Sequence, residues 1–139
     1  MKEILCFGDS NTYGLIPGTK ERYGRDTRWT GLLEQHLYEK GYRIIEEGLC
    51  GRTTVFEDEL REGRKGAALL PTLLESHAPI DRVVLMLGTN DCKSLYNASA
   101  EVIGLGIEQL LKQIRKIDSD TRILLISPIQ LGEGIKELP

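Results

Sequence analysis

Residues 4–12 read Ile-Leu-Cys-Phe-Gly-Asp-Ser-Asn-Thr, an apolar run that ends in Gly, Asp and Ser. A second run of the same form, Val-Val-Leu-Met-Leu-Gly-Thr-Asn-Asp, occupies residues 83–91. Each run predicts a buried strand followed by a turn of small polar side chains. Parallel strands end at one edge of a sheet, so we expect Ser10 and Asn90 to lie at the same edge. Open α/β sheets bind their ligands there.

The rest of the chain alternates apolar strands with amphipathic helices. We expect strands at residues 3–8, 42–47, 82–87 and 123–126. We expect helices at residues 30–40, near 66–77, and across the apolar positions of 103–117. This order predicts right-handed crossovers and a parallel sheet with helices on both faces. The polar loops 11–28 and 48–65 both follow strands, so we expect them at the edge that holds Ser10 and Asn90.

Composition excludes several classes of protein. The chain has 139 residues, 40% of them hydrophobic and 28% charged, with a net charge of −3, which predicts one globular domain over residues 1–139. It has no basic stripe for nucleic acid, and its apolar runs are too short to cross a membrane. No signal-peptide pattern precedes the first strand, and the three cysteines lack metal-ligand spacing, so we expect a cytoplasmic protein. Without a phosphate-binding or dinucleotide fingerprint, we expect no cofactor and no metal.

Ser10 and Asn90 carry groups that acyl transfer uses. A serine hydroxyl becomes a nucleophile when a base removes its proton, and the oxyanion that follows needs aligned N–H donors. The Ser10 backbone N–H, the Asn90 side chain and a backbone N–H of the glycine turn at 48–51 are candidate donors. Each motif alone is typical of a capped turn, whereas three of them at strand ends favour a site.

The motifs also resemble a known family in their order along the chain. Gly8-Asp9-Ser10, the glycine turn at 48–51 and Gly88-Thr89-Asn90-Asp91 are similar to the first three sequence blocks of the SGNH (GDSL-like) hydrolases. Arg-Trp-Thr-Gly at 28–31, Glu-Glu-Gly-Leu at 46–49 and Arg-Thr-Thr at 52–54 resemble the arylesterase/acyltransferase branch more specifically. The resemblance covers essentially the whole chain.

That resemblance implies a three-layer, flavodoxin-like α/β fold with strand order 2-1-3-4-5. It implies that Ser10 is the nucleophile, and that the Ser10 and Gly51 N–H groups and the Asn90 side chain form the oxyanion hole. The leading hypothesis is a serine esterase or acyltransferase that acts on small-molecule short acyl or aryl esters. The alternative is a non-catalytic remnant that binds acylated or carbohydrate ligands in the same cleft.

The family's fourth block, an Asp-x-x-His that supplies and orients the base, does not appear before Pro139. We therefore expect the N-terminal two-thirds of such an enzyme, truncated before the last strand and helix. His77 precedes the third expected strand and His36 lies inside the first helix, so we expect both to be structural. We expect Asp9 and Asp91 to be exposed carboxylates, too weak as bases, that fix their own turns.

Three further expectations concern surfaces. The site-side loops hold six arginines, for which a solvated face is favoured over a site that gathers an anionic group: Arg22, Arg25, Arg28, Arg52, Arg61 and Arg64. Trp29 with Tyr13 either lines an acyl pocket or anchors the first helix. The apolar strand 123–126 would be an unpaired edge without a fifth strand, so we expect a homo-oligomer.

Overall fold

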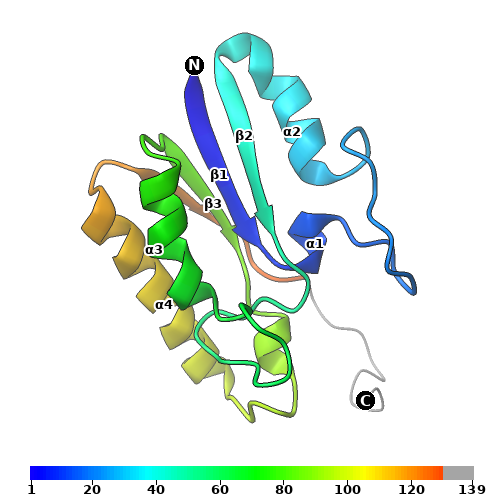
Figure 1. The fold of residues 1–139 in the computed structure, drawn as a ribbon. Coiled ribbons are helices and arrows are strands. Elements are labelled where there is room, and N and C mark those ends of the chain that lie inside the picture. Colours follow the sequence, from blue (N-terminus) through cyan, green and yellow to red (C-terminus); the bar gives the residue numbers. More distant parts are fainter. Residues whose placement is uncertain (130–139) are drawn as a thin grey trace.

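The computed structural model describes residues 1–129 (Figure 1). Its parallel sheet is formed by β1 (Lys2–Gly8), β2 (Tyr42–Gly48), β3 (Arg82–Met86) and β4 (Arg122–Leu125). The strand order is β2-β1-β3-β4. All four predicted strands are therefore confirmed, to within one residue at each end, and so is the order of these four.

The helices follow the predicted alternation. They are α1 (Ser10–Tyr13), α2 (Trp29–Leu37), α3 (Gly66–Ser76) and α4 (Ala100–Ile117), with short 3₁₀ helices η1 (Tyr38–Lys40) and η2 (Asn90–Cys92). The predicted helix 30–40 is thus α2 continued by the tighter η1, after which Gly41 turns with a φ of 90°. The hydroxyl of Ser99 accepts a hydrogen bond from the Val102 N–H and caps α4, as expected for a serine at a helix N-terminus.

Two apolar clusters cover the two faces of the sheet. Leu5 and Phe7 of β1 face a core shared with α3 and α4, whereas Ile4 and Cys6 face a core that packs against α2. Figure 1 shows α3 and α4 side by side on one side of the strands and α2 on the other. A strand buried on both faces is apolar at successive positions, which explains why β1 reads as a continuous apolar run. The three-layer α/β prediction is confirmed.

The second core decides between the two roles considered for Trp29 and explains the burial of Cys6. Trp29 packs against this core, so it anchors the first long helix. Cys6 is fully buried, and burial raises the pKa of its thiol to about 12, so it is a small apolar residue of the core. Tyr13 lies under the guanidinium of Arg22, whose carbon is 4.3 Å from the ring centroid.

Two glycines allow backbone to approach the sheet edge closely. A Cβ on Gly48 would lie 2.6–2.7 Å from backbone atoms of Thr12 and Tyr13, so α1 rests directly on the end of β2. A Cβ on Gly106 of α4 would meet the hydroxyl of Thr54 and lie 3.2 Å from Val55. Glycine lowers the stability of a helix interior, but Gly106 is the position where α4 touches the loop that follows β2.

The last strand of the sheet has one hydrogen-bonded neighbour among the described residues, which is β3. Leu124 and Leu125 are 58% and 46% exposed, although their side chains are apolar. This is the unpaired apolar edge that the sequence predicts for residues 123–126. In residues 1–129, no helix has the length and apolar character needed to cross a membrane.

Candidate active site

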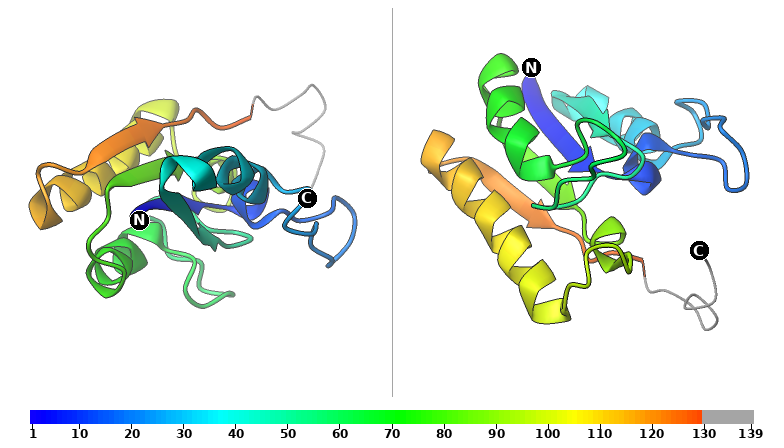
Figure 2. Two further views of the ribbon diagram at one scale, coloured as in Figure 1. Left: turned by 90° about the horizontal axis from the view of Figure 1, so that it is seen from above. Right: turned by 60° about the horizontal axis from the view of Figure 1, so that its bottom comes forward.

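The register of the sheet brings the three predicted site segments to one edge. Gly8 lies between Gly48 of β2 and Met86 of β3, and adjacent strands are about 4.8 Å apart. Ser10 follows Gly8 by two positions, and Gly51 and Asn90 follow the neighbouring strand ends. In Figure 1 the arrowheads of β1 and β2 point downward to α1 and to the loop that follows β2, and the right-hand view of Figure 2 brings the lower side of the molecule forward.

Hydrogen bonds join these segments directly. The Leu49 N–H donates to the Gly8 carbonyl at 3.2 Å, which ties the loop after β2 to the end of β1. The side-chain amide of Asn90 donates from Nδ2 to the Arg52 carbonyl at 3.0 Å. An amide NH₂ carries two hydrogens, so Asn90 is held in place and keeps one donor for another acceptor.

Ser10 begins the short helix α1. Its predecessor Asp9 caps the helix by accepting from the Asn11 N–H at 3.0 Å, and Gly14 ends it with a φ of 90°. Ser10 is partly exposed and Gly51 is buried with a φ of 84°, a conformation that favours glycine. Among the described residues, no acceptor takes the backbone N–H of Ser10 or of Gly51.

The prediction that Asp9 and Asp91 are exposed is wrong. They are 2% and 0% exposed, and burial is the main cause that raises the pKa of each carboxyl. Asp9 does fix its own turn, as predicted. Asp91 instead accepts from the Thr54 N–H at 3.0 Å and from the Thr54 hydroxyl, because η2 turns its side chain toward the loop after β2. Asp91 therefore fastens the segment of Asn90 to that loop.

The prediction that the loop arginines form a solvated face is also wrong for Arg52. Its side chain is 4% exposed, and Nη1 donates to the carbonyls of Glu47 at 2.6 Å and Gly8 at 3.3 Å. Its guanidinium carbon lies 4.2 Å from the ring centroid of Phe7. Burial lowers the pKa of Arg52 to about 10, so it stays charged at neutral pH. A carbonyl oxygen can accept two hydrogen bonds, so the guanidinium adds a donor to the Gly8 carbonyl, which also accepts from Leu49, and to the Glu47 carbonyl at the end of β2.

Two other arginines are held by one carboxylate, Glu46 near the end of β2. Arg28 donates to Glu46 from Nε at 2.6 Å and from Nη2 at 2.9 Å, and Arg25 donates from Nη1 at 2.9 Å. The hydrogen bonds from Arg28 are the main cause that lowers the pKa of Glu46 to about 2. Arg25 also donates to Glu34 of α2 at 3.0 Å. These contacts hold the loop before α2 against the sheet.

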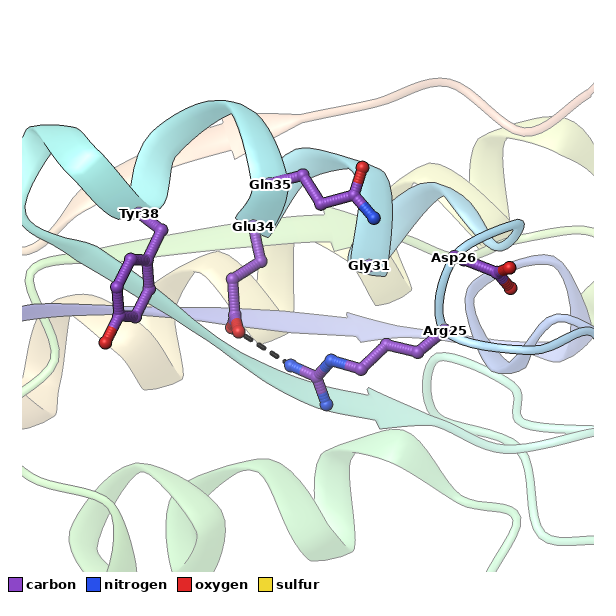
Figure 3. A pocket seen from close by; sticks show the side chains of 6 residues that line it. All are labelled: Arg25, Asp26, Gly31, Glu34, Gln35 and Tyr38. Carbon is purple, nitrogen blue, oxygen red and sulfur yellow. Dashed lines mark hydrogen bonds and ion pairs between the residues drawn. The ribbon is translucent and has the colours of Figure 1, made fainter.

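A pocket of about 420 Å³ lies beside this network (Figure 3). It is lined by Arg25, Asp26, Gly31, Glu34, Gln35 and Tyr38. Figure 3 shows the ion pair between Arg25 and Glu34 within it. Its lining includes none of the three predicted site residues, and its main charged groups already pair with each other, so the candidate active site is the sheet edge instead.

The histidines do not meet the serine. His77 lies 3.4 Å from the carboxylate of Glu47, and His36 is exposed in the last turn of α2. Within residues 1–129, neither forms a hydrogen bond with Ser10, and no three His, Cys, Asp or Glu side chains gather as metal ligands. The end of the chain, where the fourth block was sought, lies outside the described residues.

The fold and this edge define a three-layer α/β protein with a serine turn beyond a central strand. The GDSL-like lipase/acylhydrolase family matches residues 6–137, and the chain belongs to that family. The resemblance inferred from the sequence blocks is confirmed.

Solved structures give the same assignment. A carbohydrate acetylesterase family member from Sinorhizobium meliloti is 38% identical with a TM-score of 0.90, over 99% of this chain and 67% of that one. An inhibitor-bound aryl esterase from M. smegmatis is 38% identical with a TM-score of 0.84, over 92% and 64%. A putative arylesterase from Agrobacterium tumefaciens is 36% identical with a TM-score of 0.82, over 90% and 62%. The chain spans about two thirds of these relatives, and no curated protein matches it.

Proposed function

We propose that the protein containing this chain is a serine esterase or acyltransferase for short acyl and aryl esters. The observation that carries the proposal is the edge of the sheet where hydrogen bonds bring together three groups: the serine that begins α1, two backbone N–H groups that have no acceptor among residues 1–129, and the fixed side-chain amide of Asn90. The similarity to an aryl esterase and to a carbohydrate acetylesterase supports this substrate class, including acetyl groups on sugars.

In this mechanism, the Ser10 hydroxyl loses its proton to a base while its oxygen attacks the acyl carbon. The carbonyl oxygen becomes an oxyanion, which accepts from the Ser10 and Gly51 N–H groups and from the free hydrogen of the Asn90 amide. One such donor raises kcat by a factor of about 10²–10³. The alcohol then leaves with a proton, and water or a second alcohol releases the acyl group from Ser10.

The base is the part of this mechanism that the described residues do not supply. His77 is engaged by Glu47, and His36 is exposed on α2. We propose that the histidine belongs to the Asp-x-x-His block that the family resemblance implies. The 139-residue chain alone should then turn over esters orders of magnitude more slowly than a protein that has this block, because a triad without its base keeps only residual catalysis.

The test compares Ser10→Ala with the exposed control Ser119→Ala in the longest natural protein that contains these residues. On a chromogenic acetyl ester, Ser10→Ala should leave less than about 1% of kcat and abolish covalent labelling by a fluorophosphonate. Ser119→Ala should do neither. Turnover by Ser10→Ala within a few-fold of the unmodified protein would refute the assignment. Ligand binding without any Ser10-dependent turnover would favour the non-catalytic alternative.

We also propose that the protein resides in the cytoplasm. Cys6, Cys50 and Cys92 are all free thiols in the described structure. Reducing compartments keep thiols in this state, whereas oxidising compartments favour disulfides. Fractionation of the source cells with a tagged protein tests the location, and recovery in an exported fraction would contradict it.

A further inference from the structure

Arg52 is a buried charged residue to which the proposed reaction assigns no role. Its side chain is 4% exposed, and within the described residues its Nε–H has no hydrogen-bond partner. Burying a guanidinium is unfavourable, and apolar residues of similar volume often replace buried charges at no loss of stability. Stability alone is therefore a weak explanation for an arginine at this place.

The contacts of Arg52 reach every segment of the candidate site. Its Nη1 donates to the carbonyl of Gly8, two residues before Ser10, and to that of Glu47 at the end of β2. Its own carbonyl accepts from Asn90 Nδ2 at 3.0 Å. Among the described residues, Arg52 alone has hydrogen bonds to all three segments.

Gly51 and Arg52 are consecutive residues at the centre of this arrangement. Gly51 carries the N–H that we assign to the oxyanion hole, and Arg52 carries the carbonyl that orients the Asn90 amide. The guanidinium packs on the ring of Phe7, which lies in the core and cannot shift freely. The planar guanidinium of an arginine stacked on an aromatic ring has a defined orientation, whereas the ammonium group of a lysine, on its flexible stem, does not.

We propose that Arg52 is a positioning residue of the oxyanion hole: its guanidinium locks the turn after β2 to the ends of β1 and β2, and so fixes the Gly51 N–H and the Asn90 amide relative to Ser10. This inference rests on the proposed function. Its test separates the two, because it includes a measurement that does not depend on turnover.

The kinetic test uses Arg52→Met, which keeps the length and apolar stem, and Arg52→Lys, which keeps the charge. Arg82→Met is the matched control, because Arg82 also lies over an aromatic ring, that of Tyr42, but at the opposite edge of the sheet. Displaced catalytic groups lose about 10- to 100-fold in rate, so Arg52→Met should lower kcat by that factor with KM nearly unchanged. Arg52→Lys should fall between, and Arg82→Met should match the unmodified protein.

The second measurement is the NMR signal of the Asn90 side-chain amide together with amide exchange at Gly51. In Arg52→Met, the amide signal should shift and broaden and the Gly51 N–H should exchange faster, whereas Arg82→Met should change neither. If the unmodified protein shows no Ser10-dependent turnover, the proposed function fails and these signals alone decide the positioning role. Unchanged kcat, an effect on KM only, or unchanged Asn90 signals in Arg52→Met would each overturn the inference.

Should Arg52→Met fail to fold, Arg52→Ala with added guanidinium replaces it. The truncated side chain leaves space beside Phe7, and a free guanidinium ion fits the vacated contacts. Recovery of kcat with guanidinium, and not with methylammonium, supports positioning by the fork. No recovery, together with full activity in Arg52→Lys, would mean that only the positive charge matters and would refute the proposed role.

Discussion

Replacing Glu46 by Gln tests the ionic contact that holds the loop before α2 to the sheet. The Glu46 side chain is 9% exposed and the Arg28 side chain is 11% exposed, so water screens their contact weakly. A pKa lowered from 4.5 to about 2 corresponds to about 3 kcal/mol, since one pKa unit is worth about 1.4 kcal/mol. Arg25 is 51% exposed and adds little. Glu46→Gln should therefore lower the free energy of unfolding by about 2–3 kcal/mol at pH 7.

The sign of the pH dependence follows from the direction of the pKa change. The folded pKa of Glu46 lies below its ordinary value, so the contribution is complete above about pH 5 and is lost as the pH falls toward 2. About 1 kcal/mol should remain at pH 3. The pKa values of Asp9 and Asp91 are raised, so these residues have the opposite effect on the pH dependence of stability. The unmodified protein and Glu46→Gln share this effect, so it cancels in the difference between their free energies of unfolding.

The assay is urea unfolding followed by the fluorescence of Trp29, the single tryptophan, which packs against the core beneath α2. Glu108→Gln is the control, because Glu108 and its partner Lys112 are 55% and 76% exposed and should contribute less than about 0.5 kcal/mol. A difference between the unmodified protein and Glu46→Gln that stays the same at pH 7 and pH 3 would refute the reasoning. So would a difference no larger than that of the control.

Two further predictions concern the oxyanion donor and the sheet edge. Asn90→Ala should lower kcat by about 10²–10³ with a smaller change in KM, and a rise in KM alone would make Asn90 a ground-state contact instead. We also propose that the 139-residue chain self-associates along β4, so light scattering should show species above 15.6 kDa. Leu124→Lys should reduce these species, whereas Leu105→Lys, at an equally exposed leucine of α4, should not. A monomer at high concentration with slow amide exchange in residues 122–127 would contradict this proposal.

The strands could be predicted because their signal is local, whereas their order was predicted only from the family resemblance. Buried parallel strands are short apolar runs, and the turn residues after them mark where each run ends. α1 was not separated from the loop 11–28, because four residues are too few to show a helical period.

The buried charges at the site could not be predicted because their partners are distant in sequence. Arg52 donates to the Gly8 carbonyl across 44 positions, and Asp91 accepts from Thr54 across 37. A charged residue in a polar loop is exposed by default, and only the fold reveals the strand-end carbonyls and the hydroxyl that make burial favourable. The Arg-Thr-Thr run after Gly51 was visible as part of a family block, but nothing local assigned a structural task to it.

Gly106 has a consequence for anyone who wishes to redesign this protein. It lies in the middle of α4, and its missing side chain lets Thr54 reach the helix while Thr54 also holds Asp91. A single methyl group at position 106 would push on Thr54, and through Asp91 on the neighbouring Asn90. Mutations that displace the candidate site are thus to be sought on the outer helix as well as among the loops. A library confined to residues near Ser10 would miss them.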